Sequence, residues 1–277
     1  MPDMKKSGLL ILFLFLLSAC AAIPLRPPQK TVSIQPGGET LPFPQFLGSI
    51  GNEKMIFIGE QHDRKKDHRA QYEVIEQLHK RGKKITIALE MFSTAMQWSL
   101  DEWVAGGMGE EDFKNIYYFE WQMSYYLYRD IFLFARKNKI PLVGINESES
   151  LIQEVARKGT KQLSKEALES VKFTPCSADP GYAKIIQGMQ KPAHSGPIPY
   201  FCDAQRIRDH VIAYYIARLA ETREDTIVVL LGGMHAVRPA VPKALQKHGS
   251  YKYKILMPGE YGRLLGIDSK KADYIWY

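Results

Sequence analysis

The sequence predicts an α/β fold in which a mostly parallel central sheet is flanked by helices and carries a helical insert. Four short apolar runs support this prediction, and polar residues follow each of them. The runs are 55–58, 85–89, 141–145 and 226–231. Apolar runs of this length, separated by stretches with helical periodicity, are typical of buried parallel strands. Ligands of such sheets bind beyond the carboxyl ends of the strands, so the polar residues there are candidates for a site.

The chain begins with a predicted lipoprotein signal peptide, residues 1–19. Lys5 and Lys6 form a basic start, and the apolar core 9–17 has the length of a signal segment. Such a core is too short to span a bilayer as a mature helix. Leu17-Ser18-Ala19-Cys20 has the pattern of a bacterial lipoprotein cleavage site, which makes Cys20 the expected lipidated residue. We therefore expect a lipid anchor in the bacterial cell envelope, at the outer membrane; an ordinary signal peptide is the alternative.

Residues 20–45, rich in Pro and Gly, are expected to be a tether that leads to a single α/β domain at 46–277. Removal of Lys5, Lys6 and Asp3 with the signal peptide lowers the formal charge from +7 to +6. A mildly basic exported protein need not bind nucleic acid, and we expect none as a partner. The charge fits either an ordinary solvated surface or an anionic ligand or lipid surface.

Two cysteines remain besides Cys20, namely Cys176 and Cys202. They flank a stretch rich in Pro and Gly, and export places them in an oxidising compartment. We therefore predict a disulfide between them, with two independent buried thiols as the alternative.

Helical patterns fill most of the intervals between the predicted strands. Tyr72, Ile75 and Leu78 repeat at three-residue spacing, which predicts a helix over 64–80. The aromatic-rich region 93–138 is the predicted helical insert, because a simple crossover needs far fewer residues. Within it, helices are expected at 101–104 and 123–137. Later helices are expected at 148–158, from 164 onward, at 181–190 and at 203–218, and final strands at 251–257 and 273–276.

Four side chains at the strand ends form the main candidate site. Glu60 and His62 follow the first strand, where alternation places them on the same side if the strand continues. Glu90 and His235 follow two other strands at equivalent points. Two histidines and two carboxylates can bind a divalent metal or act as general acid and base. The alternative for each residue alone is an ordinary position at a strand end.

Three more candidates lie in the irregular stretch 174–200, which contains five prolines. A loop this long in a compact domain is usually functional or disordered. Tyr182, Lys191 and His194 could meet an acidic ligand there, or they could simply be exposed. The chain contains no Walker loop, no Gly-x-Gly-x-x-Gly, no Gly-x-Ser-x-Gly and no Cys-x-x-Cys-His. This disfavours ordinary nucleotide enzymes, serine hydrolases and covalent haem attachment.

A set of motifs in fixed order runs through about 50–240. They are Gly59-Glu60-x-His62-Asp63, Leu89-Glu90-Met91-Phe92, Gln97 with Leu100-Asp101, Trp121 with Tyr128-Arg129, Phe134-Ala135-Arg136, Asn146, Ala204-Gln205-x-x-Arg208-Asp209 and Gly232-Gly233-x-His235. At these residues the chain resembles the ChaN family of bacterial lipoproteins, which is associated with haem or iron uptake. Two positions depart from the family pattern: Glu147 stands where a proline is expected, and Ala236 where a valine is expected.

The resemblance implies non-covalent, b-type haem held between two protomers. In the family a tyrosine ligates the iron, and a histidine and a lysine of the other protomer bind the propionates. Tyr182, Lys191 and His194 have the residue types for these roles, so Tyr182 is the expected iron ligand. Ligation by a tyrosinate requires that the phenol pKa, normally near 10, is lowered by the ferric ion and by neighbouring cations. A haem-binding protein is thus expected rather than an enzyme, with a ligand-linked homodimer and an outer-membrane haem receptor as partners.

An enzymatic function is the alternative. The wider fold group includes erythromycin esterases and metal-dependent proteases, which place similar Glu and His residues at the same strand ends. The alternative is therefore a metal- or His/Glu-dependent hydrolase acting with Glu60, His62, Glu90 and His235. If a divalent metal takes part, its expected ligands are Glu60, His62 and His235. A third possible function is that of a carrier for another anionic, planar ligand.

Overall fold

The computed structural model describes residues 31–34, 39–187, 198–259, 266, 268 and 270–276, with the backbone alone for 31–34. The signal peptide, Cys20, Lys191 and His194 lie outside the described residues. Within the described part of the chain, no helix is both long and apolar enough to cross a membrane.

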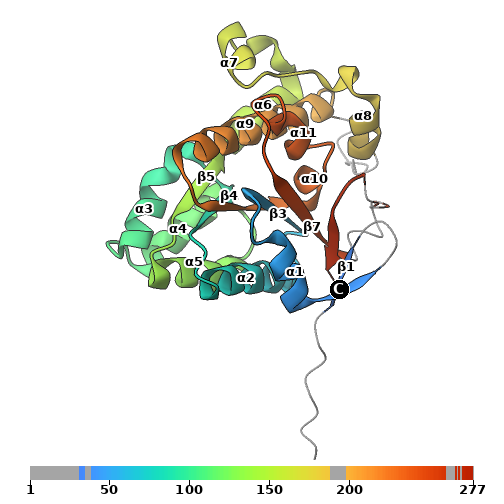
Figure 1. Cartoon of the computed structure of the whole chain (residues 1–277). Helices are drawn as coiled ribbons and strands as arrows, with labels where there is room; N and C mark the ends of the chain where they lie inside the picture. Colours follow the sequence, from blue (N-terminus) through green and yellow to red (C-terminus); the bar gives the residue numbers. More distant parts are fainter. Residues whose placement is uncertain are drawn as a thin grey trace, which may run out of the picture.

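A central sheet organises the fold, and its strand order is β2-β1-β8-β7-β3-β6-β4-β5 (Figure 1). The strands are β1 Thr31–Ile34, β2 Thr40–Pro42, β3 Met55–Glu60, β4 Ile85–Ser93, β5 Leu142–Asn146, β6 Thr226–Gly232, β7 Tyr253–Pro258 and β8 Tyr274–Trp276. The six strands from β8 to β5 are parallel, whereas β1 pairs antiparallel with β2 and β8. The predicted α/β fold with a mostly parallel sheet is confirmed.

The edge strands β1 and β2 lie earlier in the chain than any strand predicted from the sequence. The interval 20–45 was expected to be a tether, yet Thr31–Ile34 and Thr40–Pro42 pair with each other. Thr31-Val32-Ser33-Ile34 is rich in β-branched residues, which favour strands. The sheet therefore includes residues that precede 46.

Helices cover both faces of the sheet (Figure 1). On one face lie α1 Phe43–Ile50, α2 Lys65–Lys80, α3 Gln97–Ala105, α4 Glu110–Glu120 and α5 Tyr125–Asn138. On the other lie α9 Phe201–Thr222, α10 Gly233–Ala236 and α11 Val241–Leu245, with α6 Glu149–Lys158 packed against α9. The remaining short elements are η1 Thr94–Met96, η2 Thr160–Gln162, α7 Lys165–Ser170, η3 Cys176–Ala178 and α8 Pro180–Gln187.

Alternation along β3 divides the core into these two layers. Ile56 and Ile58 pack with α1 to α5, whereas Met55 and Phe57 pack with α9 to α11. All four side chains are almost completely buried. Every second residue of a strand faces the same layer, so Glu60 continues the side of Ile56 and Ile58.

The helical insert between β4 and β5 is built on stacked aromatic rings. The rings of Trp103 on α3 and Phe113 on α4 stack with centroids 4.3 Å apart, and Phe132 on α5 meets Phe113 edge-on at 5.2 Å. Helices were expected at 101–104 and 123–137, and the structure forms α3 and α5 there. The sequence did not predict α4, because Phe113 and Tyr117 are its only buried positions and leave a weak periodicity.

The predicted disulfide is present. Cys176 of η3 and Cys202 of α9 are bonded, across a sequence separation of 26. The backbone N–H of Cys176 also donates to the Asp203 carboxylate at 2.7 Å. The start of α9 is therefore tied twice to the segment that precedes α8.

Candidate functional site

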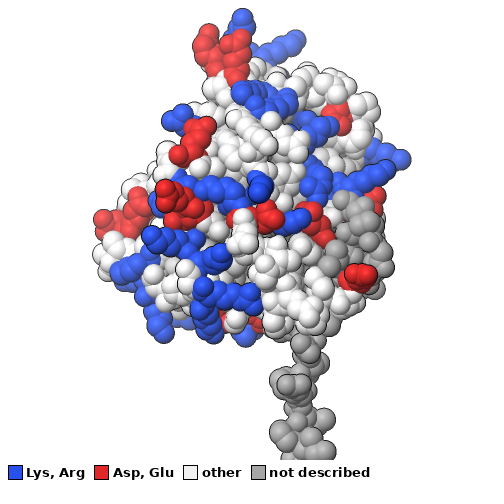
Figure 2. Space-filling view, in the orientation of Figure 1, with Lys and Arg blue, Asp and Glu red and all other residues white. Residues whose placement is uncertain are grey.

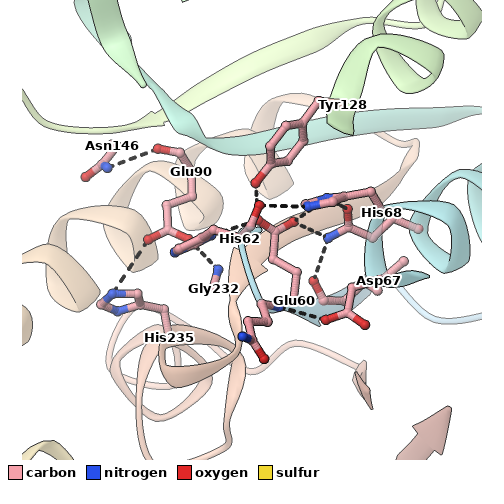
Figure 3. Close-up of polar contacts among 12 residues, drawn as sticks. Glu60, His62, Asp67, His68, Glu90, Tyr128, Asn146, Gly232 and His235 are labelled. Atoms are coloured by element: carbon pink, nitrogen blue, oxygen red, sulfur yellow. Dashed lines mark hydrogen bonds and ion pairs between the residues drawn. The ribbon is translucent and has the colours of Figure 1, made fainter. Parts of the chain in front are cut away.

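The strand-end side chains gather at the carboxyl edge of the sheet, as predicted (Figure 3). β3 and β4 both pair with β6, and Glu60 lies opposite Gly232 in that register. Glu60 and Glu90 end up 1% exposed, and His235 is 6% exposed. Two carboxylates and one imidazole are thus almost completely shielded from water, where electrostatic interactions are strong.

Glu60 is held by donors from three elements. Its Oε1 accepts hydrogen bonds from His62 Nδ1 at 2.8 Å and from the hydroxyl of Tyr128 on α5. Its Oε2 accepts from Nε2 of Gln71 on α2 at 2.6 Å. His68 Nδ1 lies 3.4 Å from the same Oε2. These donors favour the ionised carboxylate.

His68 must be an imidazolium, because both of its ring nitrogens face acceptors. Nε2 lies 3.0 Å from the carbonyl oxygen of His62. Nδ1 lies 3.2 Å from Oε1 of Gln71. The Gln71 amide cannot be reversed, since its nitrogen already donates to Glu60 Oε2. Both imidazole nitrogens therefore carry protons.

The pKa values agree with this charged pair. Burial would raise the pKa of Glu60, but hydrogen bonds from His62 and His68 outweigh it and lower the pKa far below its usual range. Burial would lower the pKa of His68, but the hydrogen bond and charge of Glu60 outweigh it and raise the pKa. The interior thus holds a carboxylate and an imidazolium together.

Glu90 belongs to a second group, on the other face of the sheet. Its Oε2 accepts the backbone N–H of Gly232 at 2.5 Å, and its Oε1 lies 3.6 Å from Nε2 of His235. His235 Nδ1 is 2.6 Å from the Asp209 carboxylate on α9. Burial lowers the pKa of His235, but the charges of Glu90 and Asp209 outweigh it and raise the pKa. Asn146 donates to the Glu90 carbonyl at 3.0 Å and so fixes β4 against β5.

Gly232 separates the two groups and brings His62 between them. A Cβ at this position would lie 2.7 Å from Cε1 and 2.9 Å from Nε2 of His62, and 3.5 Å from Oε2 of Glu90. Because glycine has no Cβ, the His62 ring can lie over the end of β6. The ring also meets Trp121 edge-on at 5.0 Å. The His62 side chain is 33% exposed and is the accessible member of the site.

The alternative divalent-metal site, with Glu60, His62 and His235 as ligands, is not preformed among the described residues. No group of three or more His, Cys, Asp and Glu side chains among the described residues is arranged to hold a metal ion. His62 and His235 each direct Nδ1 to a carboxylate, and Glu60 points to the opposite face from Glu90. The constellation is an arrangement of hydrogen-bonded acid–base pairs.

A small polar cleft leads to Glu90. It has a volume of about 190 Å³ and is bounded by the ends of β4 and β5, by Trp121, and by the acidic side chains Glu120, Glu147 and Glu149. Glu90 is therefore reached through an acidic opening. Among the described residues, neither Oε1 of Glu90 nor Oδ2 of Asp209 has a hydrogen-bond partner.

Tyr182 lies on α8 with its hydroxyl directed inward. The side chain is 1% exposed, and the guanidinium carbon of Arg206 stands 4.4 Å from the ring centroid. Burial and then the Asp209 carboxylate raise the pKa of Tyr182 well above 10. Iron ligation through this phenolate would need α8 to move, and the other two residues expected with it lie outside the described residues.

Three residues of the site were missed from the sequence, namely Gln71, Tyr128 and Asp209, and the position of His68 about two turns after Glu60 had only suggested a place near the site. His68 and Gln71 lie three residues apart on α2, which puts both on the face toward Glu60. Tyr128 and Asp209 occur in the motifs quoted above, but nothing in the sequence pairs them with Glu60 or His235. Their contacts are tertiary and span 68 and 26 residues.

Comparison with known proteins is consistent with the sequence motifs. Residues 46–245 match the family described as haem-binding uptake, Tiki superfamily, ChaN. The fold is similar to that of ChaN of Campylobacter jejuni, solved with cofacially bound haem, with a TM-score of 0.62 and 17% identity over 90% of this chain and 98% of that one. A mutant of the erythromycin esterase EreC in its open conformation is also similar, with a TM-score of 0.50 and 13% identity over 82% of this chain and 76% of that one. No curated protein sequence matches the chain. Because the family match covers most of the chain, the protein belongs to the ChaN family of haem-binding uptake proteins.

Proposed function

We propose that this protein binds non-covalent haem through a tyrosinate, between two protomers, in haem or iron uptake. The family match over residues 46–245 carries the proposal. The solved relative with the same fold is described as binding haem cofacially, which fits haem groups brought together by a dimer. Lipidation at Cys20 would hold the dimer at the envelope membrane, near an outer-membrane haem receptor.

The surface beside α8 has the chemistry for the propionates. A hollow of about 600 Å³ is lined by Tyr182 and by Lys184, Lys243 and Lys270. Lys243 is paired with Asp179 at 2.6 Å, so the ammonium groups of Lys184 and Lys270 would complement the two carboxylates of haem. Tyr182 forms part of this wall with its ring, so a rotation of α8 would be needed to present the hydroxyl. Lys191 and His194, close in sequence, remain proposed propionate ligands.

Haemin titration of the chain truncated to begin at Cys20, with Cys20→Ser, tests the proposal. Saturable binding, a tyrosinate charge-transfer band and a doubling of the mass by light scattering support it. Tyr182→Phe, with Tyr214→Phe as a matched control, then tests Tyr182 as the ligand. Non-saturable binding to a monomer would count against the proposal. Accumulation of unprocessed Cys20→Ala precursor in cells tests the anchor separately.

A hydrolase is the second candidate function, and the orientation of His62 favours it. Glu60 fixes the proton of His62 on Nδ1, which leaves Nε2 facing Gly232 as an acceptor in the neutral ring. A base held by a buried carboxylate and partly open to solvent is the arrangement that general-base catalysis requires. His235, held by Asp209, is the second acid–base group.

Turnover of a panel of chromogenic esters would test this candidate. His62→Gln and His235→Gln should each abolish turnover, whereas His79→Gln, on the far end of α2, should leave it unchanged. Equal turnover in the unaltered protein and the three variants would show that this site does not catalyse the hydrolysis.

A further inference from the structure

The cleft that leads to Glu90 is lined by carboxylates and, among the described residues, by no cationic side chain. Besides Glu90 at the end of β4, its walls contain Glu120, Glu147 and Glu149. Glu149 is paired with Arg208 at 2.5 Å, whereas no cation of the described residues lies within ion-pair distance of Glu120 or Glu147. The cleft therefore carries negative charge that favours a cationic ligand.

This charge is opposite to that of the chain as a whole. The formal charge of the chain is +7, and Lys and Arg side chains cover more of the face drawn in Figure 2 than Asp and Glu side chains do. The hollow beside α8, where we place haem, is lined by Lys184, Lys243 and Lys270. The cleft would repel the carboxylates of haem, so the two places suit ligands of opposite charge.

Glu90 has a buried oxygen that no group of the described residues satisfies. The side chain is 1% exposed, and its Oε2 accepts the backbone N–H of Gly232 at 2.5 Å (Figure 3). Its Oε1 has no hydrogen-bond partner in the described part of the chain, because Nε2 of His235, 3.6 Å away, is too far for a hydrogen bond. Buried polar atoms without a partner are rare in native proteins, and each calls for an explanation such as a bound ion.

Two aromatic side chains, Phe119 and Trp121, complete the wall of the cleft at the end of α4. Nε1 of Trp121 is also buried without a hydrogen-bond partner among the described residues. Aromatic rings attract organic cations and pack against their carbon atoms. An ammonium compound can therefore donate a proton to Glu90 while its apolar part lies against these rings.

We propose that this cleft binds a small primary ammonium compound, whose –NH₃⁺ group donates to Oε1 of Glu90. The charges of Glu120 and Glu147 complement the bound cation, and the volume of about 190 Å³ limits the ligand to a small molecule. A bare metal ion is a poorer match, since no three metal-binding side chains of the described residues surround one point. The inference rests neither on haem binding nor on the hydrolase candidate.

Benzylamine and benzyl alcohol are matched probes, because they have similar shapes and only the amine is charged at pH 7. Both are titrated by NMR into the chain truncated to begin at Cys20, with Cys20→Ser. Benzylamine should bind saturably, and benzyl alcohol should bind about tenfold more weakly or less, since it cannot form a charge-assisted hydrogen bond with Glu90. Equal affinities, or no saturable binding of benzylamine, would overturn the inference and leave the haem proposal unchanged.

The indole N–H signals report where benzylamine binds. The signal of Trp121, assigned with Trp121→Phe, should move during the titration. That of Trp103, which donates to the carbonyl oxygen of Phe132, should stay in place. Saturable binding that leaves the Trp121 signal unmoved would overturn the assignment to this cleft.

Charge-removing variants test the carboxylates. Glu90→Gln should weaken benzylamine binding by about tenfold, and Glu147→Gln by up to about fivefold, because the second carboxylate is nearer to solvent. The matched control is Glu154→Gln on α6, which removes a carboxylate paired with Lys158 outside the cleft and should leave the affinity unchanged. Affinities of Glu147→Gln and Glu154→Gln that both equal that of the unaltered protein would contradict the proposal, even if Glu90→Gln does not fold. Circular dichroism establishes which variants are folded.

Discussion

Glu60 and Glu90 occupy the carboxyl ends of β3 and β4, yet they lie on opposite faces of the sheet. Glu60 contacts Gln71 and Tyr128 in the layer of α2 and α5. Glu90 faces His235 in the layer of α10. His62 is the one described side chain that reaches from Glu60 over Gly232 toward Glu90. The site is therefore two buried acid–base groups joined at the end of β6.

Glu60→Gln should destabilise the protein strongly. The substitution leaves the His68 imidazolium buried without its carboxylate, and breaking a buried ion pair typically costs about 3–5 kcal/mol. Urea unfolding followed by circular dichroism measures the change. Glu76→Gln, which removes a pair with Lys80 on the same layer of the protein, is the control and should cost less than about 1 kcal/mol. Similar losses in both variants would contradict the buried pair.

The free energy of unfolding should decrease both below and above a narrow pH range. The lowered pKa of Glu60 contributes stability above its unfolded value of 4.5, and this is lost as pH falls toward the folded pKa. The raised pKa of His68 contributes stability that is full below 6.5 and is lost as pH rises through the folded pKa. The two contributions are both complete between these unfolded values. Urea midpoints at a series of pH values measure this, and a midpoint that keeps rising above pH 7 would contradict the imidazolium.

Gly232→Ala should displace His62 without straining the backbone. The φ of Gly232 is −53°, which alanine adopts readily, so the effect comes from the Cβ that would lie 2.7 Å from the ring. The hydrogen bond from His62 to Glu60 should be lost, and with it the raised pKa of His62. Histidine NMR titration measures the shift. Gly48→Ala on α1, where no atom lies within 4 Å of the new Cβ, should leave the His62 titration unchanged.

Cys176→Ser should lower stability by about 3 kcal/mol, because the bond closes a loop whose ends are 26 residues apart. The same loss should follow when the unaltered protein is treated with a reductant, and the variant should show no further loss. Thiol counting under denaturing conditions checks that the bond was present. If reductant destabilises the variant as well, the effect has another origin.

The sequence predicted the positions of the strands well, because fully buried parallel strands are continuous apolar runs and their ends are marked by polar residues. It also placed Glu60, Glu90 and His235 at the correct edge of the sheet. It could not show that Glu60 and Glu90 face different layers, since this depends on where the strand alternation ends. Asp209 was missed because its partner His235 lies 26 residues away. The Tyr182 hydroxyl points inward because of the way α8 packs, and this packing cannot be predicted from the periodicity of the sequence.

Haemin titration of the chain truncated to begin at Cys20, with absorbance and light scattering recorded together, decides whether the protein binds haem through a tyrosinate in a dimer. We expect saturable binding with a tyrosinate band that develops in step with a doubling of the mass. A chain that stays monomeric, and binds haemin without saturation or a tyrosinate band, would contradict it.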